Sequence, residues 1–386
     1  MKYKMGLWNY YAIGGYDVET MAQDFTDLGF NFVMSCDYNP DAPDFHEKGL
    51  FLRHLDLLHE RNMKVIVCDA RTGWNRLTTQ GEEAFLKGVK QAVEDFGSHP
   101  AVYGFHIGDE PNGKQMDDMI KAFKIVKAAA PHLYPFVNFL PLFAKDDYFE
   151  QVLGVPHDKY GELIDRVVKE AGIELLCYDF YRQCTYFNQE QGEKDYFENL
   201  RLFGEIAKRN DIPFFTTLLS VGHWNYRIPD EDDIRWQIST AVASGVTGIL
   251  WFYVYARNKP EESYRNQPVD LFNMRTETFG RLARQNRIFM EFCANQLEDY
   301  EYVDTYAVGK EYGGFKAWTK GDFGIDEIEL TDGTSAPLLL ARFHGDKGYR
   351  FVIVNCERKM PAKIKVVKKE GGLNRWFAPG QMAIFD

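Results

Sequence analysis

The 386-residue sequence lacks the features of several protein classes. It contains no run of about 18 apolar residues, the length that a membrane-spanning helix requires. Its formal net charge of −12 offers no basic footprint for nucleic acid or for an anionic membrane. No GxGxxG or Walker loop follows the first predicted strand, which disfavours a nucleotide-binding fold. We therefore expect neither nucleic acid nor a membrane as a partner.

Cysteine is scarce, and its spacing indicates no metal site. The six cysteines form no CxxC pair, and those at positions 36, 68 and 177 lie within apolar, strand-like runs. Buried free thiols are therefore expected rather than disulfides, and no metal or other cofactor is expected. The N-terminal residues lack the apolar core of a signal peptide. The sequence as written thus predicts a cytoplasmic protein. The alternative is a secreted or periplasmic protein whose signal peptide has been removed.

Aromatic residues, in contrast, are abundant. Phe, Tyr and Trp together make up 15% of the chain, and many of them fall at the ends of predicted strands. Aromatic rings stack on the apolar faces of flat or ring-shaped ligands, sugars included. Most of the Phe residues are expected in the core, which leaves Tyr and Trp as candidates for ligand contact.

Short apolar runs alternate with amphipathic stretches of helical period, such as 18–28, 51–61, 81–96 and 114–130. Strands that are apolar on both faces and alternate with helices indicate a parallel sheet covered by helices. A count of eight favours a closed (β/α)₈ barrel over an open sheet. The eight predicted strands are 6–11, 32–37, 64–69, 102–107, 134–139, 175–180, 214–219 and 248–254.

The period of the apolar residues changes to two after the eighth helix, which indicates β-structure. We expect the barrel to occupy residues 1–298 and a small antiparallel, sandwich-like β-domain to occupy residues 299–386. The strands predicted there are 302–308, 314–319, 336–343, 349–355, 362–367 and 381–385.

The active site of a (β/α)₈ barrel lies at the C-terminal ends of the strands. Polar or aromatic side chains occur at that end of every predicted strand, which a purely structural barrel would not need. The residues predicted to bind substrate are Trp8, Tyr10, Asp37, Asp69, Trp74, His106, Asn138, Tyr181, His223, Trp224, Trp251 and Tyr253.

The fourth predicted strand ends in Asp109 and Glu110, and Pro111 stops it. Carboxylates are almost never fully buried unless they are paired or used. Glycosidic cleavage requires one carboxyl group that stays protonated and a second that is ionised. Glu110 suits the acid, because crowding by Asp109 and nearby rings would raise its pKa. Asp109 is expected to orient Glu110 or a neighbour such as His106.

The segment 99–111, HPAVYGFHIGDEP, resembles strand four of the barrel glycoside hydrolases that include the family 42 β-galactosidases. Segments 136–141, 178–181 and 241–253 resemble strands five, six and eight, and segments 351–355 and 378–381 resemble the accessory β-domain of that family. The resemblance implies a glycosidase that cleaves O-glycosidic bonds of an oligo- or polysaccharide with Glu110 as general acid.

Two positions depart from the pattern of that family. Asp109 stands where the family usually has Asn, and segment 214–224 contains no carboxylate although the family nucleophile is a strand-seven glutamate. Asp179 is the first candidate for the second carboxylate, because other barrel glycosidases pair strands four and six. The alternatives are an ion pair of Asp179 with Arg71 or Arg182, or a second carboxylate from Asp37, Asp69, Glu261 or Glu262.

Two other classes of function remain open at this point. A carbohydrate-binding barrel without catalysis would keep the aromatic residues but lack two facing carboxylates. A metal-dependent sugar isomerase or hydrolase would use His106, Asp109, Glu110 and His223. Only two histidines fall at predicted strand ends, fewer than zinc and manganese sites usually recruit.

Overall fold

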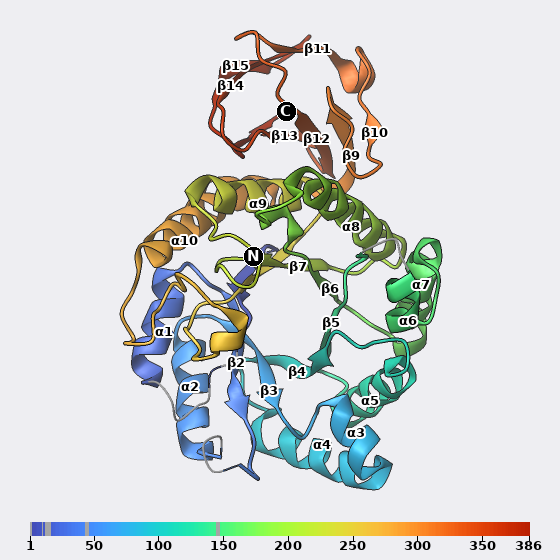
Figure 1. Ribbon diagram of the computed structural model, residues 1–386, viewed down its shortest axis with the longest axis vertical. Helices are drawn as coiled ribbons and strands as arrows, with labels where there is room; N and C mark the ends of the chain where they lie inside the picture. The colour runs from blue at the N-terminus through green and yellow to red at the C-terminus, as the bar shows by residue number, and fades with distance from the viewer. Residues whose placement is uncertain (1, 10, 12–16, 43–45, 144–146) are drawn as a thin grey trace.

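The computed structural model describes residues 2–9, 11, 17–42, 46–143 and 147–386. Its strands and helices alternate to form a parallel (β/α)₈ barrel followed by a small β-domain, as the sequence predicts (Figure 1). The barrel strands are β1 (Lys4–Leu7), β2 (Phe32–Tyr38), β3 (Lys64–Asp69), β4 (Val102–Asp109), β5 (Tyr134–Phe139), β6 (Leu176–Asp179), β7 (Phe214–Leu219) and β8 (Gly248–Phe252).

Helices form a ring around these strands (Figure 1). Helix α9 begins after Asp230, which forms a reciprocal capping box with Asp233 at the N-terminus of the helix. None of the described helices is long and apolar enough to cross a bilayer. The main helices are α1 (Val18–Asp27), α2 (Lys48–Glu60), α3 (Trp74–Gln80), α4 (Glu82–Phe96), α5 (Met116–Ala129), α6 (Asp147–Leu153), α7 (Tyr160–Ala171), α8 (Gln189–Arg209), α9 (Glu231–Ala243) and α10 (Glu277–Ile288).

The barrel is closed between β1 and β2 by Asn31, the residue before β2, whose backbone amide donates to the Met5 carbonyl (2.9 Å) and whose side chain adds two further hydrogen bonds. These two strands are the ends of the hydrogen-bonded strand order. Asn31 bridges them, because its Oδ1 accepts from the Met5 amide (2.9 Å) and its Nδ2 donates to the Tyr3 carbonyl (3.0 Å). Gly6 permits this approach, since a Cβ there would lie 1.5 Å from the carbonyl oxygen of Phe32.

Apolar side chains fill two layers of the barrel. An interior layer contains buried Phe32, Met34, Ile66, Phe136 and Phe215, and a larger cluster lies between the strands and the helices. Burying a Phe side chain contributes roughly 1.5–3 kcal/mol to the free energy of folding. All six cysteines are free thiols, and five of them are buried.

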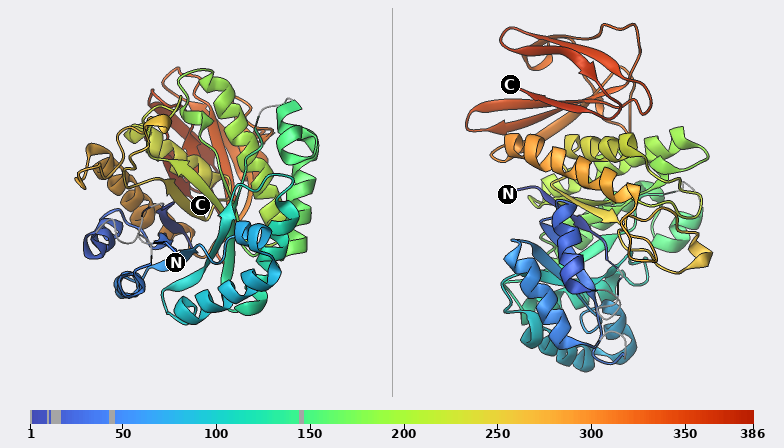
Figure 2. Two further views of the ribbon diagram at one scale, coloured as in Figure 1. Left: turned by 60° about the horizontal axis from the view of Figure 1, so that its bottom comes forward. Right: turned by 90° about the vertical axis from the view of Figure 1, so that its left-hand side faces the viewer.

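The C-terminal β-domain contains two sheets packed around a small core of their own. It lies against α8 and α9 at one side of the barrel (Figures 1 and 2). Sequence analysis missed β11 and β15 because most of their side chains are partly or fully exposed and many are charged. The five-stranded sheet has the order β10 (Lys316–Ala317), β9 (Glu301–Val308), β12 (Leu338–Gly345), β13 (Gly348–Asn355), β16 (Met382–Phe385), and the three-stranded sheet has the order β11 (Ile325–Leu330), β14 (Ala362–Lys368), β15 (Gly372–Phe377).

Candidate active site

A cavity of about 490 Å³ opens at the C-terminal ends of the barrel strands, mainly those of β4 to β8. It brings together eight of the residues predicted from the sequence, including all three predicted catalytic carboxylates. Those eight are Trp8, Asp109, Glu110, Asn138, Asp179, Tyr181, His223 and Trp224.

The ends of β4 and β6 carry the carboxylates, and β5 between them carries an amide side chain. Asn138 on β5 links its neighbours, because its Nδ2 donates to Asp109 Oδ1 (3.1 Å) and to Asp179 Oδ1 (2.8 Å). The amide of Glu110 donates to the Asn138 carbonyl (2.9 Å), which continues the β4–β5 ladder past Asp109. Glu110 itself has a φ of 47°, a left-handed conformation that is rare for a residue other than glycine and that occurs at functional sites.

The side chains of Glu110 and Asp179 are hydrogen-bonded to each other. Two carboxyl groups in contact hold one proton between them, because two ionised groups would repel. The negative charge of Asp179, burial and the charge of Asp109 together raise the pKa of Glu110 well above its usual range. The shared proton is therefore assigned to Glu110 at neutral pH.

Asp179 is the better stabilised of the two as an anion. Burial raises its pKa, but donors from Asn138, Glu110 and Tyr181 oppose that shift. Arg71 and Arg182, the predicted ion-pair partners of Asp179, bind other carboxylates: Arg71 binds Asp69 (2.7 Å), and Arg182 binds Asp195 (2.9 Å). The site thus holds one protonated and one ionised carboxyl group side by side.

Aromatic rings from β8 and from the loops after β6 and β7 form another part of the cavity wall. Tyr181 stacks on Phe252 with ring centroids 5.2 Å apart, and His223 lies between Phe252 and Tyr226. Burial lowers the pKa of His223 to about 4, so this imidazole is neutral at pH 7. At the rim, Trp224 is 60% exposed. A ring-shaped ligand would meet flat apolar faces on this side.

Three predicted substrate-binding residues lie in a different, smaller cavity of about 320 Å³ at the ends of β2, β3 and β4. Asp69 is bound there by Arg71, and burial raises the pKa of Asp37 to about 7 and lowers that of His106 to about 4. Asp37, Asp69 and His106, which are predicted to bind substrate, therefore lie outside the cavity that holds Glu110 and Asp179. Strands β2 and β3 direct their end residues toward this second cavity.

Three predicted aromatic contacts are also corrected. Trp251 is fully buried, and its Nε1 donates to Asn286 Oδ1 (3.0 Å) in α10, on the outer side of the barrel. Trp74 covers Gly108, where a Cβ would lie 1.9 Å from its ring. Tyr253 is 1% exposed and packs edge-on beneath Tyr264, with centroids 4.9 Å apart. Side chains on a strand alternate in direction, so Phe252 lines the cavity while its two neighbours do not.

Tyr10, another predicted contact, lies outside the described residues. Of the remaining candidates for the second carboxylate, Glu262 lines the cavity but is bound by Lys259 (3.1 Å) and by the hydroxyl of Tyr264. Glu261 is exposed and does not line the cavity. Asp179 alone among the candidates contacts Glu110.

Sequence reasoning missed several residues of the cavity wall. Phe252 could have been found from the inward direction of Leu250 two positions earlier on β8. The others lie in loops, where no periodic signal indicates direction. The missed residues include Leu140, Pro141, Phe143, Tyr226, Phe252, Lys259 and Tyr264.

The metal-dependent class requires a set of ligands. Among the residues that the structure describes, no group of three or more His, Cys, Asp or Glu side chains is arranged to hold a metal ion. His106 and His223, the histidines of that hypothesis, lie in different cavities. The arrangement favours carboxylate chemistry.

Comparison with solved structures identifies the architecture. The chain superposes on β-galactosidases from Bacillus circulans sp. alkalophilus (TM-score 0.58, 10% identity), Marinomonas ef1 (0.56, 11%) and Halorubrum lacusprofundi (0.54, 11%). The likeness is one of fold. These matches cover 81%, 76% and 74% of this chain but only 59%, 60% and 58% of those proteins, so the chain spans less than two thirds of their length. In sequence, the chain matches no family model and no curated protein.

Proposed function

We propose that this protein is a glycoside hydrolase that cleaves O-glycosidic bonds of an oligo- or polysaccharide, with Glu110 as general acid and Asp179 as the second carboxylate. The observation that carries the proposal is the hydrogen-bonded pair of Glu110 and Asp179 in a cavity walled by aromatic rings. The shared fold with enzymes named as β-galactosidases supports the same class of reaction.

In the proposed reaction, Glu110 gives its proton to the glycosidic oxygen as the bond to the anomeric carbon breaks. Asp179 either attacks that carbon, after which water activated by Glu110 hydrolyses the resulting ester, or takes a proton from the water that attacks the carbon directly. Two hydrogen-bonded carboxyl groups lie closer together than the ~5–5.5 Å or ~6.5–9.5 Å separations of retaining and inverting enzymes. Glu110 must therefore turn away from Asp179 when a sugar enters. Asp179 is buried and held by Asn138 and Tyr181, so Glu110 is the partner that moves.

Substrate binding is assigned to the aromatic wall and to Asn138. The buried Oδ1 of Asn138 has no hydrogen-bond partner among the described residues, and a hydroxyl group would satisfy it. A protein that only binds carbohydrate would gain nothing from two carboxyl groups in contact. Burying the two groups together lowers the free energy of unfolding at pH values above the pKa of an ordinary glutamate. Such a cost is typical of catalytic groups.

A screen of the purified protein against a panel of oligo- and polysaccharides tests this function. We expect release of reducing sugar from at least one glycan, and proton NMR of the first product anomer distinguishes retention from inversion. The Glu110→Gln variant serves as the background control. Binding of a glycan by both proteins with no cleavage by either would instead support the non-catalytic alternative.

The charge of Asp109 predicts a specific change in pH dependence. Asp109→Asn removes one of the charges that raise the pKa of Glu110, so Glu110 should lose its proton at lower pH. The alkaline limb of the profile of kcat/KM against pH is expected to move to lower pH. Asp346→Asn removes the same charge from an exposed turn of the β-domain and should leave the limb in place. An unchanged or upward-shifted limb in Asp109→Asn would contradict the assigned role.

A further inference from the structure

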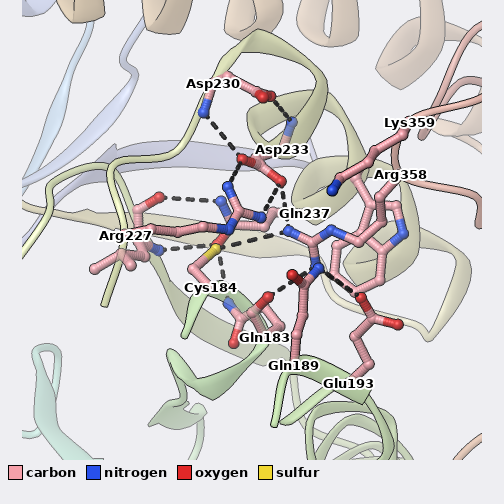
Figure 3. Close-up of polar contacts among 12 residues, drawn as sticks. Gln183, Cys184, Gln189, Glu193, Arg227, Asp230, Asp233, Gln237, Arg358 and Lys359 are labelled. Carbon is pink, nitrogen blue, oxygen red and sulfur yellow. Dashed lines mark hydrogen bonds and ion pairs between the residues drawn. The ribbon is translucent and has the colours of Figure 1, made fainter. Parts of the chain in front are cut away.

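A buried ion cluster joins the β-domain to the barrel (Figure 3). Its centre is Arg358, which follows β13 and is 8% exposed. Its Nη2 donates to Asp233 Oδ1 on α9 (2.5 Å), and its Nη1 donates to the carbonyl of Gln183 (2.9 Å). Its guanidinium carbon also lies 4.4 Å from the ring centroid of Trp236. One side chain of the β-domain thus binds two separate segments of the barrel.

A second arginine completes the cluster from the loop after β7. Arg227 Nη2 donates to Asp233 Oδ1 (2.6 Å), so two arginines share one carboxylate. Although burial alone would raise it, the hydrogen bond from Arg227 and the charges of Arg358 and Arg227 hold the pKa of Asp233 well below its usual range. The amide of Arg227 also donates to the carbonyl of Cys184 (2.7 Å). The loops after β6 and β7 are therefore bound to each other, the first is bound directly to Arg358, and the second is linked to Arg358 through Asp233.

The cluster is connected to the cavity by short steps along the backbone. The 3₁₀ helix η3 (Arg182–Cys184) begins directly after Tyr181, and the Cys184 amide donates to the Tyr181 carbonyl (2.9 Å). Tyr181 in turn donates a hydrogen bond to Asp179. On the other loop, Tyr226 precedes Arg227 and lines the cavity. Tyr181 thus lies two residues before Gln183, which Arg358 binds, and Tyr226 lies next to Arg227, which shares the carboxylate of Asp233 with Arg358.

A glutamine extends the connection to the end of β7. Gln183 Nε2 donates to Gln237 Oε1 (3.0 Å), and Gln237 pairs with both the amide and the carbonyl of Leu219 (3.0 Å each). The backbone segments that end β6 and β7 therefore have fixed partners in α9 and in the β-domain. Stability alone does not explain this choice of residues, because well-packed apolar side chains often stabilise a protein as much as a buried ion cluster does.

We propose that Arg358 is a positioning residue, through which the β-domain holds Tyr181 and Tyr226 in place around the sugar-binding cavity. This role rests on the glycosidase function proposed above, since the two tyrosines are the groups that would contact Asp179 and the substrate. The β-domain then supports the active site in addition to packing on the barrel.

The test replaces Arg358 in the full-length chain. Arg358→Met removes the charge and the hydrogen-bonding fork but keeps an unbranched apolar side chain over Trp236. Hydrogen–deuterium exchange of segments 182–187 and 223–228 should become roughly tenfold faster or more, with the barrel strands unchanged. On a glycan that the wild type cleaves, kcat should fall and KM should rise together, for a loss of about 10–100-fold in kcat/KM. Arg358→Lys keeps the charge without the planar fork and should give intermediate values.

Arg342→Met is the matched control. Arg342 pairs with Asp304 (Nε–Oδ1, 2.6 Å) inside the β-domain, so its loss should leave the two segments and KM unchanged. A positioning role is overturned if Arg358→Met exchanges like the wild type, if it only reduces the amount of folded enzyme with KM unchanged, or if Arg342→Met has the same effects. If Arg358→Met does not fold, the test rests on Arg358→Lys. Exchange rates and a KM equal to those of the wild type in Arg358→Lys would also overturn the positioning role. If the wild type cleaves no glycan, the function fails while the exchange data still decide the role of Arg358.

Discussion

Glu110→Gln is expected to reduce turnover of natural glycosides by about 10²–10⁴-fold. Glutamine preserves the shape of the side chain but has no proton to give to the glycosidic oxygen. Activated aryl glycosides should lose much less activity, because their leaving groups depart with little protonation. The measurement is kcat/KM of wild type and variant on both kinds of substrate. The alkaline limb that reports the raised pKa of Glu110 should also be absent from the variant.

Glu262→Gln provides the matched control for this variant. Glu262 also lines the cavity, but Lys259 and Tyr264 bind its carboxylate. We expect the ratio of kcat/KM on natural glycosides to kcat/KM on activated glycosides to be the same in Glu262→Gln as in the wild type. Full activity of Glu110→Gln on a natural glycoside would remove Glu110 from the role of general acid.

Asp179→Asn should abolish activity on natural and activated substrates alike. An ionised carboxylate is needed after the leaving group has been protonated, whatever that group is, so a good leaving group offers no rescue. The expected loss is at least about 10²–10⁴-fold in kcat for both substrates. Removal of the Asp179 charge, the largest cause of the raised pKa of Glu110, should also lower that pKa. The alkaline limb of any residual activity should therefore move to lower pH.

Asp37→Asn tests the competing assignment of the second carboxylate. Asp37 lies one residue before the end of β2, much as Asp179 lies at the end of β6, but Asp37 lines the smaller cavity. Activity close to that of the wild type is expected. If Asp37→Asn were inactive and Asp179→Asn active, the carboxylate pair proposed here would be wrong.

Periodicity made the barrel predictable. Strands such as β3, β5 and β7 match their predicted bounds because each is a short apolar run between clear breaks. The ends of β1 and β8 were less accurate: β1 was predicted over 6–11 and is Lys4–Leu7, where aromatic residues beyond the strand extended the apparent run. The boundary between the two domains at residue 298 stays a prediction.

The position of the candidate site in the barrel was predictable from the sequence, but only some of the residues that line it were. Knowing that a residue ends a strand does not reveal which way its side chain points, and this error moved Trp251 and Tyr253 into the predicted site in place of Phe252. Loop residues such as Tyr226 and Tyr264 reach the cavity through turns that carry no periodic signal. The contact between Glu110 and Asp179 depends on the register of β4, β5 and β6, which periodicity does not determine.

The closure of the barrel by Asn31 has a consequence for how the protein forms on the ribosome. Strand β1 pairs with β8, and Lys4 lies opposite Gly248 in this ladder. The β1–β8 hydrogen bonds can therefore form only after residue 248 has been synthesised. In the finished structure, Asn31 supplies hydrogen-bond partners to β1 on the β2 side. The carboxylates come from β4 and β6, with Asn138 of β5 between them, so they are synthesised before β8 and before the β1–β8 ladder can form. The aromatic residues at the ends of β7 and β8 are synthesised after them, so the wall of the proposed site can be complete only when the last barrel strand is present.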